Sequence, residues 1–460
     1  MAEASTSAGV TDIAGFIDQQ PVGRFQIRLL LICAAVLFLD GFDTQAIGYV
    51  APALAGDWSL ARGALGPVFS AGLFGLMIGA LVFGPVADRV GRKRVIVVST
   101  ATFGLGALAT VFAYDITSLL VIRFLTGLGL GGALPNAVAL TSEFSPHRRR
   151  ATMVMAMFVG FSVGAALGGL IAAALIPSFG WRSVFLIGGV TPLLLVPFLM
   201  ARLSESVRFL ALTGEADARV GELLARIAPS VRFPTGARFG VHETKLTGIP
   251  VSHLFSEGRA LATLVLWVVF FMSLLDLYLL SNWLPTVLND LGASISTAAV
   301  VGAMFQVGGV IGTFALGKFI DRFSFRALSL IYFLAAAAVA MIGYSGQSIA
   351  FATFAIFCAG FCIIGGQIAA NALAATYYPT MVRSTGIGWA LGIGRIGSIV
   401  GPLIGGIMLA RQVGAPSLFM AAAVPALCAS IAALVFAKIA KAGSAADSFV
   451  QPVGAAKLGK

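Results

Sequence analysis

Leu39-Asp40-Gly41-Phe42-Asp43-Thr44-Gln45 places two carboxylates three residues apart inside an apolar run that extends from Phe25 to about Val50. A run of this length can cross the ~30 Å hydrocarbon core of a bilayer as one helix. A charged side chain at the centre of such a helix costs roughly 2.5 to 3.5 kcal/mol on insertion scales, so two of them in one span indicate a function. We therefore predict a membrane helix here, with Asp40 and Asp43 as its functional residues.

Similar apolar segments recur along the rest of the chain. The sequence is 58% hydrophobic and 11% charged, with a mean hydropathy of +0.97, which no single water-soluble core can bury. Segments long enough to span a bilayer as helices begin near Phe25, Leu65, Val95, Ser118, Ala151, Ser183, Arg259, Ser296, Arg326, Ile349, Val382 and Ala415. Because these runs are continuously apolar rather than alternating, they exclude a β-barrel. The sequence thus predicts an all-α integral membrane protein with twelve transmembrane helices.

The distribution of basic residues predicts how these helices are oriented. Lys and Arg are concentrated in the short loops on the side of the N-terminus, whereas the short loops of the other side hold Arg62, Arg182 and Arg411. Cytoplasmic loops carry such an excess, and residues 1–20 lack the basic and apolar regions of a secretory signal. We expect both termini to be cytoplasmic. The net charge of +11 then reflects topology and contact with anionic lipids, and no nucleic-acid partner is expected.

The second half of the sequence repeats the first without a gap. The offset that places Asp43 on Asp276 also places Pro52 on Pro285 and aligns the glycines of the second span, Gly75, Gly79 and Gly84, with Gly308, Gly312 and Gly317. Each repeat holds six spans, an even number, so both halves enter the membrane from the same side. This predicts two parallel six-helix halves with the ligand site at midplane between them.

The repeat also predicts the division of the chain. We expect an N-terminal tail at 1–24, six-helix halves at 25–202 and 259–438, a central cytoplasmic loop at 203–258 and a cytoplasmic tail at 439–460. The central loop is the longest polar stretch, and its pattern is compatible with a short amphipathic helix on the membrane surface. We interpret the loop as a tether between the halves.

Gly84-Pro85-Val86-Ala87-Asp88-Arg89-Val90-Gly91-Arg92-Lys93 resembles the signature loop between spans two and three of the major facilitator superfamily, and Gly317-Lys318-Phe319-Ile320-Asp321-Arg322 resembles its weaker second copy. Glycines allow two spans to approach closely, and the charges at the cytoplasmic lip can bridge the halves in one conformation. We interpret this group as a gate, formed by Gly84, Asp88, Arg89, Arg92, Asp321 and Arg322, with Arg383 at the inner lip. The alternative is that these charges only set the topology.

Two further motifs narrow the resemblance. Asp40-Gly41-Phe42-Asp43 in the first span and Gly127-Leu128-Gly129-Leu130-Gly131-Gly132-Ala133-Leu134-Pro135-Asn136 in the fourth are similar to the aromatic acid:proton symporters of this superfamily. The similarity covers essentially all twelve spans. It implies alternating-access uptake of a benzoate-like carboxylate, driven by the proton gradient, across the bacterial inner membrane.

Charges buried within the spans identify candidate coupling residues. At 1.5 Å per residue, Asp43 and Arg123 lie at similar depths below the outer surface, so Asp43, or Asp40 one turn below it, can pair with Arg123. A carboxylate beside an arginine can exchange its partner for a proton when helices move. We assign proton coupling to Asp40, Asp43, Arg123 and Glu143, the last at the inner end of span four. The alternative is a static ion pair that fixes the helix register.

Arg395 lies near the midplane of the eleventh span, and its repeat position is the neutral Ser162. A lone guanidinium suits a carboxylate ligand because it binds one through two parallel hydrogen bonds; the alternative is an internal partner such as Asp276. Side chains near the same depth complete the predicted substrate site, namely Asp276, Phe42, Tyr278, Phe305, Gln306, Asn371 and Trp389. Core packing is the alternative for each of them.

Several alternatives of function stay open at this point. Transport direction is not encoded in these motifs, so a proton-coupled exporter or antiporter of organic anions or drugs is the nearest alternative; an integral membrane enzyme and a receptor without transport belong to other classes. The three histidines, His147, His242 and His253, fall in loops, so no metal site and no cofactor is predicted. We expect a monomer whose partners are an aromatic carboxylate, protons and the lipid bilayer, and which is not an enzyme.

Overall fold

The computed structural model describes residues 10–449, except 62, 214–216, 230, 232, 234–236, 241–250, 257, 347 and 379–381. At 318, 321, 383, 384 and 441–449 it describes the backbone alone. Within these limits, twelve helices are long and apolar enough to cross a membrane, with mean hydropathies of 1.6 to 2.3. The predicted all-α fold with twelve transmembrane helices is confirmed.

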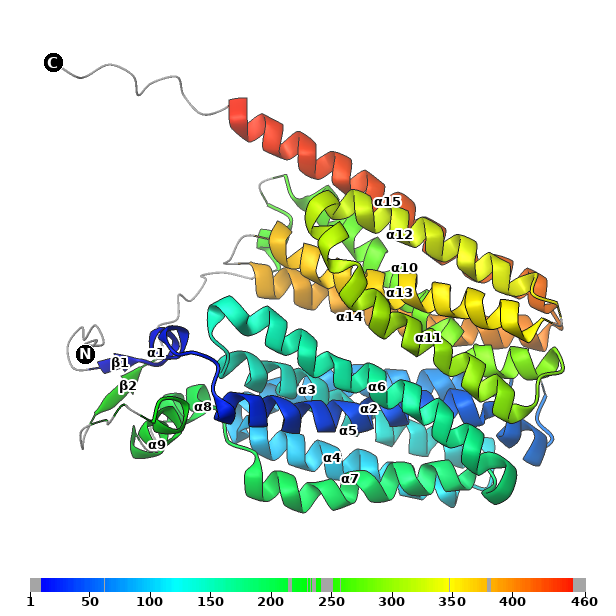
Figure 1. Ribbon diagram of the computed structural model, residues 1–460, viewed down its shortest axis with the longest axis horizontal. Helices are drawn as coiled ribbons and strands as arrows, with labels where there is room; N and C mark the ends of the chain where they lie inside the picture. The colour runs from blue at the N-terminus through cyan, green and yellow to red at the C-terminus, as the bar shows by residue number, and fades with distance from the viewer. Residues whose placement is uncertain are drawn as a thin grey trace.

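The twelve helices form two bundles of six (Figure 1). The first bundle contains α2 (Arg24–Asp57), α3 (Gly66–Val90), α4 (Arg92–Val111), α5 (Ile116–Glu143), α6 (His147–Phe179) and α7 (Arg182–Arg202). The second contains α10 (Ala260–Asp290), α11 (Ile295–Ala315), α12 (Gly317–Gly343), α13 (Ile349–Tyr377), α14 (Arg383–Ala410) and α15 (Ala415–Phe449). Helix α12 is kinked at Ser324, which has a φ of 53°, and its apolar span begins at Arg322.

Equivalent helices of the two bundles cross through equivalent glycines. A Cβ atom on Gly164 of α6 would lie 1.9 Å from the carbonyl oxygen of Phe38 on α2. At the repeat position, a Cβ atom on Gly397 of α14 would lie 2.2 Å from the carbonyl oxygen of Phe271 on α10. Small residues at helix crossings let the backbones approach closely in a membrane. The sequence repeat is therefore a repeat of helix contacts.

We expect Gly164→Ala to destabilise the first bundle, because the added methyl group would overlap the backbone of α2. Overpacking of this kind costs about 1–3 kcal/mol, measurable as a lower Tm of the detergent-solubilised protein. Gly56→Ala is the matched control on α2, since a Cβ atom there meets nothing within 4 Å. Equal Tm values for the two variants would contradict this account of the crossing.

The two bundles contact each other near the end at which α2 finishes, called here the far end. Ser70 Oγ of α3 donates to the carbonyl oxygen of Ile399 on α14 over 2.8 Å. In the repeat-related contact, Ser296 Oγ of α11 donates to the carbonyl oxygen of Ala173 on α6, also over 2.8 Å. These contacts close the far end of the interface.

Toward the opposite end, α3 and α14 diverge. Ser70 and Gly84 lie on one face of α3, and Ile399, Gly392 and Gly388 lie on one face of α14, as their helical spacing requires. Cβ atoms built on these three glycines meet no atom within 4 Å of the described structure. The same faces that touch at the far end thus face open space at the other end, and Figure 1 shows the bundles further apart there.

A small cap covers the first bundle at this open end. It consists of β1 (Val10–Asp12), α1 (Ile13–Gln19), α8 (Val207–Thr213), α9 (Asp217–Ile227) and β2 (Arg238–Gly240), followed by a 3-10 turn at Ser252–Leu254. Strands β1 and β2 pair in parallel. The buried faces of α1 and α9 form one apolar cluster with the first bundle, and the carboxylate of Asp18 accepts from the backbone N–H of His147 over 2.6 Å. We call this the cap end.

The amphipathic helix expected in the central loop is confirmed by α9, which buries Val220, Leu223, Leu224 and Ile227. The N-terminal segment was expected to be only a polar tail, and this is corrected from Val10 onward, where it forms β1 and α1. Asp12 caps α1 by accepting from the N–H of Gly15 over 2.9 Å, and Phe16 and Ile17 are buried against α9 and its neighbours. The tail is ordered because it completes the core of the cap.

Candidate functional site

Asp43 is paired with Arg123, one of the two pairings that counting residues along the helices predicted. Arg123 of α5 donates from Nη1 to Asp43 Oδ2 over 3.2 Å and from Nη2 to Asp43 Oδ1 over 3.4 Å. Both side chains are almost fully buried, with exposures of 4% and 1%. The two parallel bonds make this a bidentate pair, the strong form of a charge-assisted contact.

Arg123 is also held by other helices of the first bundle. Its Nη2 donates to the hydroxyls of Thr110 on α4 and Thr126 on α5, each over 3.2 Å. Its guanidinium lies over the ring of Phe185 on α7, 5.0 Å from the centroid. A buried charge is tolerated only when it is paired and hydrogen-bonded, so this conformation stabilises the ionised Asp43–Arg123 pair.

Asp40 lies one turn earlier on α2 but does not share this partner. Its Oδ1 accepts from Thr44 Oγ1 over 3.1 Å, whereas Oδ2 is buried without a hydrogen-bond partner in the described part of the chain. Asp40 is fully buried and interacts electrostatically with Arg395 of the second bundle. Of the two carboxylates, Asp43 is therefore paired within the first bundle, whereas Asp40 lies within electrostatic range of the second.

Gly41, between Asp40 and Asp43, is required by the packing of α2 against α6. A Cβ atom on Gly41 would lie 2.1 Å from the carbonyl oxygen of Phe161 on α6. Helix α6 therefore crosses α2 directly at the motif, and only glycine fits at this point.

Arg395 supplies the charge of the second bundle. Its Nη1 donates to the hydroxyl of Tyr278 on α10 over 3.2 Å. The Tyr278 ring packs in a small interface cluster with Leu73 of α3 and Leu274. None of the salt bridges found among the described side chains involves Arg395. The guanidinium thus has donors left over for an anion.

A small cavity adjoins the Asp43–Arg123 pair. Its volume is about 30 Å³, and its lining includes Thr44, Thr126 and, from the second bundle, Asn282. This is enough for a water molecule with several polar partners but far below the ~150 Å³ of a cavity that holds benzene. An aromatic ligand therefore requires the open space nearer the cap end or a movement of the bundles.

For the remaining predicted ligand side chains, the described structure shows hydrogen bonds and ring contacts with residues other than Arg395. Phe42 is 3% exposed, and its ring lies against Gly188 of α7 inside the first bundle. Gln306 donates to Ser281 Oγ over 3.4 Å, and Asn371 accepts from Gln367, also within the second bundle. Each of these contacts joins residues of the same bundle.

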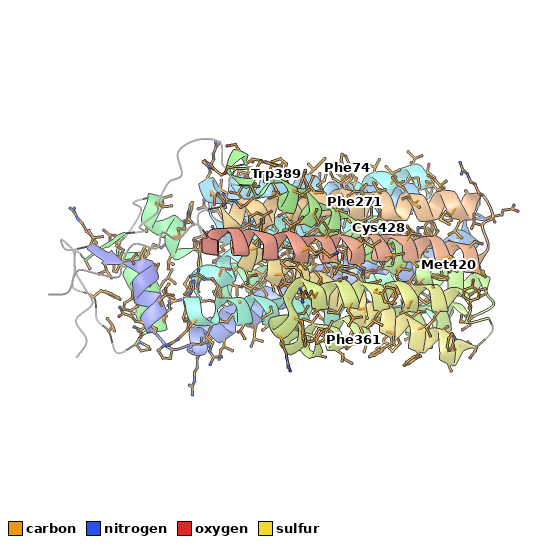
Figure 2. All side chains as sticks on the ribbon, turned by 90° about the horizontal axis from the view of Figure 1, so that it is seen from above. Phe74, Phe271, Phe361, Trp389, Met420 and Cys428 are labelled. Atoms are coloured by element: carbon orange, nitrogen blue, oxygen red, sulfur yellow. The ribbon has the colours of Figure 1, made fainter. Side chains whose placement is uncertain are left out.

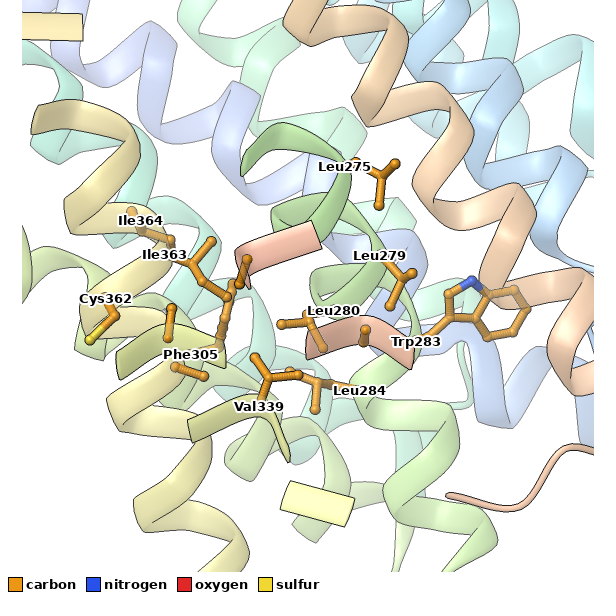
Figure 3. Close-up of a cluster of buried hydrophobic side chains, with 14 of the residues drawn as sticks. Leu275, Leu279, Leu280, Trp283, Leu284, Phe305, Val339, Cys362, Ile363 and Ile364 are labelled. Carbon is orange, nitrogen blue, oxygen red and sulfur yellow. The ribbon is translucent and has the colours of Figure 1, made fainter. Parts of the chain in front are cut away.

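Phe305 and Trp389 occupy opposite extremes of burial. Phe305 is fully buried among Leu280 and Ile363 of the second bundle (Figure 3). Trp389 is 43% exposed and stacks on Trp267 with ring centroids 5.8 Å apart. It lies at the edge of the bundle in Figure 2, on a face of α14 about 120° away from Arg395. Helix α14 therefore directs the side chain of Trp389 away from that of Arg395.

Glu143 lies with the predicted gate and away from the coupling pair. It is twenty residues along α5 from Arg123, or about 30 Å, and its Oε1 forms a salt bridge with Arg92 Nη1 over 2.9 Å. Arg92 also contacts Asp88 at 3.8 Å. The structure thus places Glu143 in a charge cluster at the cap end, as expected for the inner end of this span, and its coupling role stays a prediction.

This cluster includes two residues that the sequence did not single out. Ser206 Oγ donates a short hydrogen bond to Glu143 Oε2, and Glu205 Oε1 accepts from the backbone N–H of Lys93 over 3.0 Å. Both residues follow α7 directly, where the central loop begins. No local pattern marks them, because their role depends on the return of the loop to the start of α4.

Among the other gate charges whose side chains the structure describes, none forms a salt bridge between the bundles. The Asp88 side chain is 72% exposed, Arg89 is exposed, and Arg322 lies over the ring of its neighbour Phe323 at 5.2 Å. The side chains of Asp321 and Arg383 lie outside the described residues. For the described gate charges, this arrangement fits an interface that is open at the cap end.

A model of the Major Facilitator Superfamily matches residues 33–263 and 266–458 of the sequence. The chain belongs to this superfamily. Its superfamily and its class as a transporter rather than an enzyme, both predicted from the sequence, are confirmed.

Curated relatives of this superfamily transporter carry names of aromatic acids. It is 44% identical to the 4-hydroxybenzoate transporter PcaK of Pseudomonas aeruginosa, over 92% of this chain and 95% of the relative. It is 43% identical to the gallate transporter of Pseudomonas putida, over 92% and 94%, and 38% identical to the 3-(3-hydroxy-phenyl)propionate transporter of Escherichia coli, over 89% and 94%.

A solved structure confirms the fold of the transporter. A bacterial homologue of the human lysosomal transporter Spinster, in an inward-facing and unoccupied conformation, superposes with a TM-score of 0.67 over 92% of this chain and 98% of that chain. The sequence identity is 17%, so the likeness shows the fold alone.

Proposed function

We propose that this transporter takes up an aromatic carboxylate together with protons by alternating access. The observation that carries the proposal is the placement of charge at the interface of the bundles. Arg395 has no ion-pair partner among the described residues, and the buried carboxyl of Asp40 faces it from the other bundle. The relatives named for 4-hydroxybenzoate and gallate support an aromatic acid as the ligand.

In this proposal, Arg395 binds the substrate carboxylate through two parallel hydrogen bonds, and Tyr278 holds the guanidinium in position. A second carboxylate close to the bound anion would be repelled unless it is protonated. Asp40 therefore favours substrate binding when it carries a proton. Substrate and proton binding thus support one another, which is the reciprocity that coupled transport needs.

The Asp43–Arg123 pair has a different role in the proposed cycle. In the conformation that is closed at the far end, both carboxylate oxygens of Asp43 and both Nη atoms of Arg123 are hydrogen-bonded. We infer that opening of the far end separates the pair and that Asp43 then exchanges with Asp40 the single proton that the first bundle carries. The pair thereby links the protonation of the first bundle to the conformation of the interface.

The orientation proposed for the protein follows from the excess of basic residues at the cap end. Cytoplasmic loops carry this excess, so we place the cap and both termini in the cytoplasm of a bacterial cell, with the protein in the inner membrane. The described conformation is then the inward-facing one. The site is built from a single chain, and we propose that a monomer transports.

The function is tested by uptake into proteoliposomes with an acid-outside pH gradient. Labelled 4-hydroxybenzoate, protocatechuate, chlorophenoxyacetate and a phenylpropanoid are offered separately, with empty liposomes as the control. We expect at least one hydroxybenzoate to accumulate above its external concentration, and accumulation to stop when an ionophore dissipates the gradient. Accumulation only under the reversed gradient would show an antiporter instead.

A further inference from the structure

Asp276 is a buried carboxyl group for which the described residues provide no hydrogen-bond partner. It lies in the middle of α10, is 1% exposed, and neither of its oxygens has a hydrogen-bond partner among the residues that the structure describes. The nearest hydroxyls on its face of the helix are engaged with one another, since Tyr332 donates to Ser273 Oγ over 2.8 Å. The carboxyl therefore stands alone in the second bundle.

The repeat shows what is missing around it. Asp276 is equivalent to Asp43, whose partners are Arg123, Thr110 and Thr126. The repeat positions of these three partners hold side chains that donate no hydrogen bond, Ile356, Gly343 and Ala359, and Ile356 and Ala359 are fully buried. The second bundle thus has the equivalent carboxyl group but lacks the hydrogen-bond donors that surround Asp43 in the first.

No other charged or titratable group near this depth forms a hydrogen bond or a salt bridge with Asp276 in the described part of the chain. Arg395 of α14 is bound to Tyr278, and Asp43 of α2 is bound to Arg123. Asp40 of α2 accepts from Thr44. On α12, α13 and α15 the groups are uncharged at neutral pH in their ordinary state, namely Tyr332, Cys358, Cys362 and Cys428. Figure 3 shows the apolar surroundings one turn further along α10, where Leu280 lies near Val339 and Ile363.

An isolated ionised carboxylate in such surroundings is so unfavourable that it takes up a proton instead. We propose that Asp276 is a second proton-binding site of the transport cycle, occupied in this conformation and exchanged when α10 moves. This inference rests on the proposed proton-coupled uptake. The proton comes from the water on one side of the membrane and returns to the water on the other, so no further reactant is needed.

Movement of α10 during transport gives this proton a way in and out. On the far-end side of Asp276, Asn282 packs against Gly48 of α2, and Tyr278 packs against Leu73 of α3. These contacts must part when the far end opens, which admits water to within two turns of Asp276. On the cap-end side, the hydroxyls of Ser273 and Tyr332 lie one turn away.

A second transported proton changes the net charge that crosses the membrane with the substrate. A monoanion that moves with one proton carries no net charge, whereas the same anion with two protons carries one positive charge. Wild-type uptake should therefore respond to an inside-negative membrane potential. Asp276→Asn, which has the shape of the neutral acid and binds no proton, should abolish this response while uptake driven by a pH gradient continues.

The experiment uses proteoliposomes of the full chain, labelled 4-hydroxybenzoate, and a potassium diffusion potential without a pH gradient. Accumulation by the wild type and by Asp57→Asn, an exposed carboxyl on α2, with none by Asp276→Asn, supports the inference. An unchanged response of Asp276→Asn to the potential, or an absent response of the wild type that still uses a pH gradient, overturns it. A wild type that uses neither gradient overturns the proposed function as well.

Infrared difference spectroscopy of the same proteins gives a readout that does not require transport. We expect the carbonyl-stretch band of a buried protonated carboxylic acid in the wild type and in Asp57→Asn, and its loss or reduction in Asp276→Asn. A spectrum of Asp276→Asn that matches the wild type in this band would overturn the assignment of the proton to Asp276.

Discussion

Asp43→Asn is expected to abolish accumulation of the aromatic acid under a pH gradient, while exchange of labelled for unlabelled substrate continues. One coupled proton is worth tenfold accumulation for each pH unit, so the ratio should fall from about tenfold or more to about one. The reason is that an asparagine is neutral and does not take up a proton. It can therefore neither form the ion pair with Arg123 nor break it by protonation. The protein then changes between its inward-facing and outward-facing conformations whether or not protons are bound. Binding of a proton at Asp276 no longer controls this change.

The control for this variant lies at the other end of the same helix. Asp57 pairs with Arg182 over 3.1 Å, but both side chains are about half exposed, and exposed pairs of this kind contribute at most about 1 kcal/mol. Asp57→Asn should accumulate substrate normally. Removing one partner of a buried pair can cost about 3–5 kcal/mol, so preserved exchange shows that Asp43→Asn is folded. Normal accumulation by folded Asp43→Asn would remove Asp43 from the coupling mechanism.

Arg395→Gln is expected to weaken binding of the substrate anion by about 10-fold to 150-fold. Hydrogen bonds to charged groups contribute about 1.5–3 kcal/mol, and 1.4 kcal/mol corresponds to tenfold in affinity. Arg395→Lys should bind with intermediate affinity, because an ammonium keeps the charge but not the planar fork. Titration calorimetry of the purified variants measures these differences.

The matched control is Arg411→Gln, at the far end of the same helix, where the side chain is exposed. It removes the same charge from the chain without touching the interface between the bundles. Equal affinities of Arg395→Gln and Arg411→Gln would move the counter-ion of the substrate to another residue.

The first half of the site could be predicted from the sequence because depth in a membrane helix follows from counting residues. Counting placed Asp43 and Arg123 at one level, and the structure joins them. It could not choose between Asp40 and Asp43, because both are near that level and the choice depends on the rotation of α2. The crossing of α6 at Gly41 fixes that rotation, and this contact is long-range in sequence.

Rotation also explains why the sequence could not show which way the predicted ligand side chains point. Trp389 and Phe305 are near the depth of the site, but helices that are apolar on every face give no sequence signal for the side that faces lipid, core or interface. Arg395 was identifiable because a charge within a span must face polar surroundings. The partner of Glu143 could not be predicted, because Arg92 lies on another helix at the cap end.

The measurement that tests the proposed coupling most directly is the pH inside proteoliposomes while the substrate enters. An inward gradient of 4-hydroxybenzoate is imposed without a pH gradient, and a trapped dye reports the internal pH; empty liposomes correct for passive entry of the neutral acid. We predict acidification of the interior that depends on the protein and is lost in Asp43→Asn. Entry of labelled substrate with no change in pH, or with alkalinisation of the interior, would contradict proton symport.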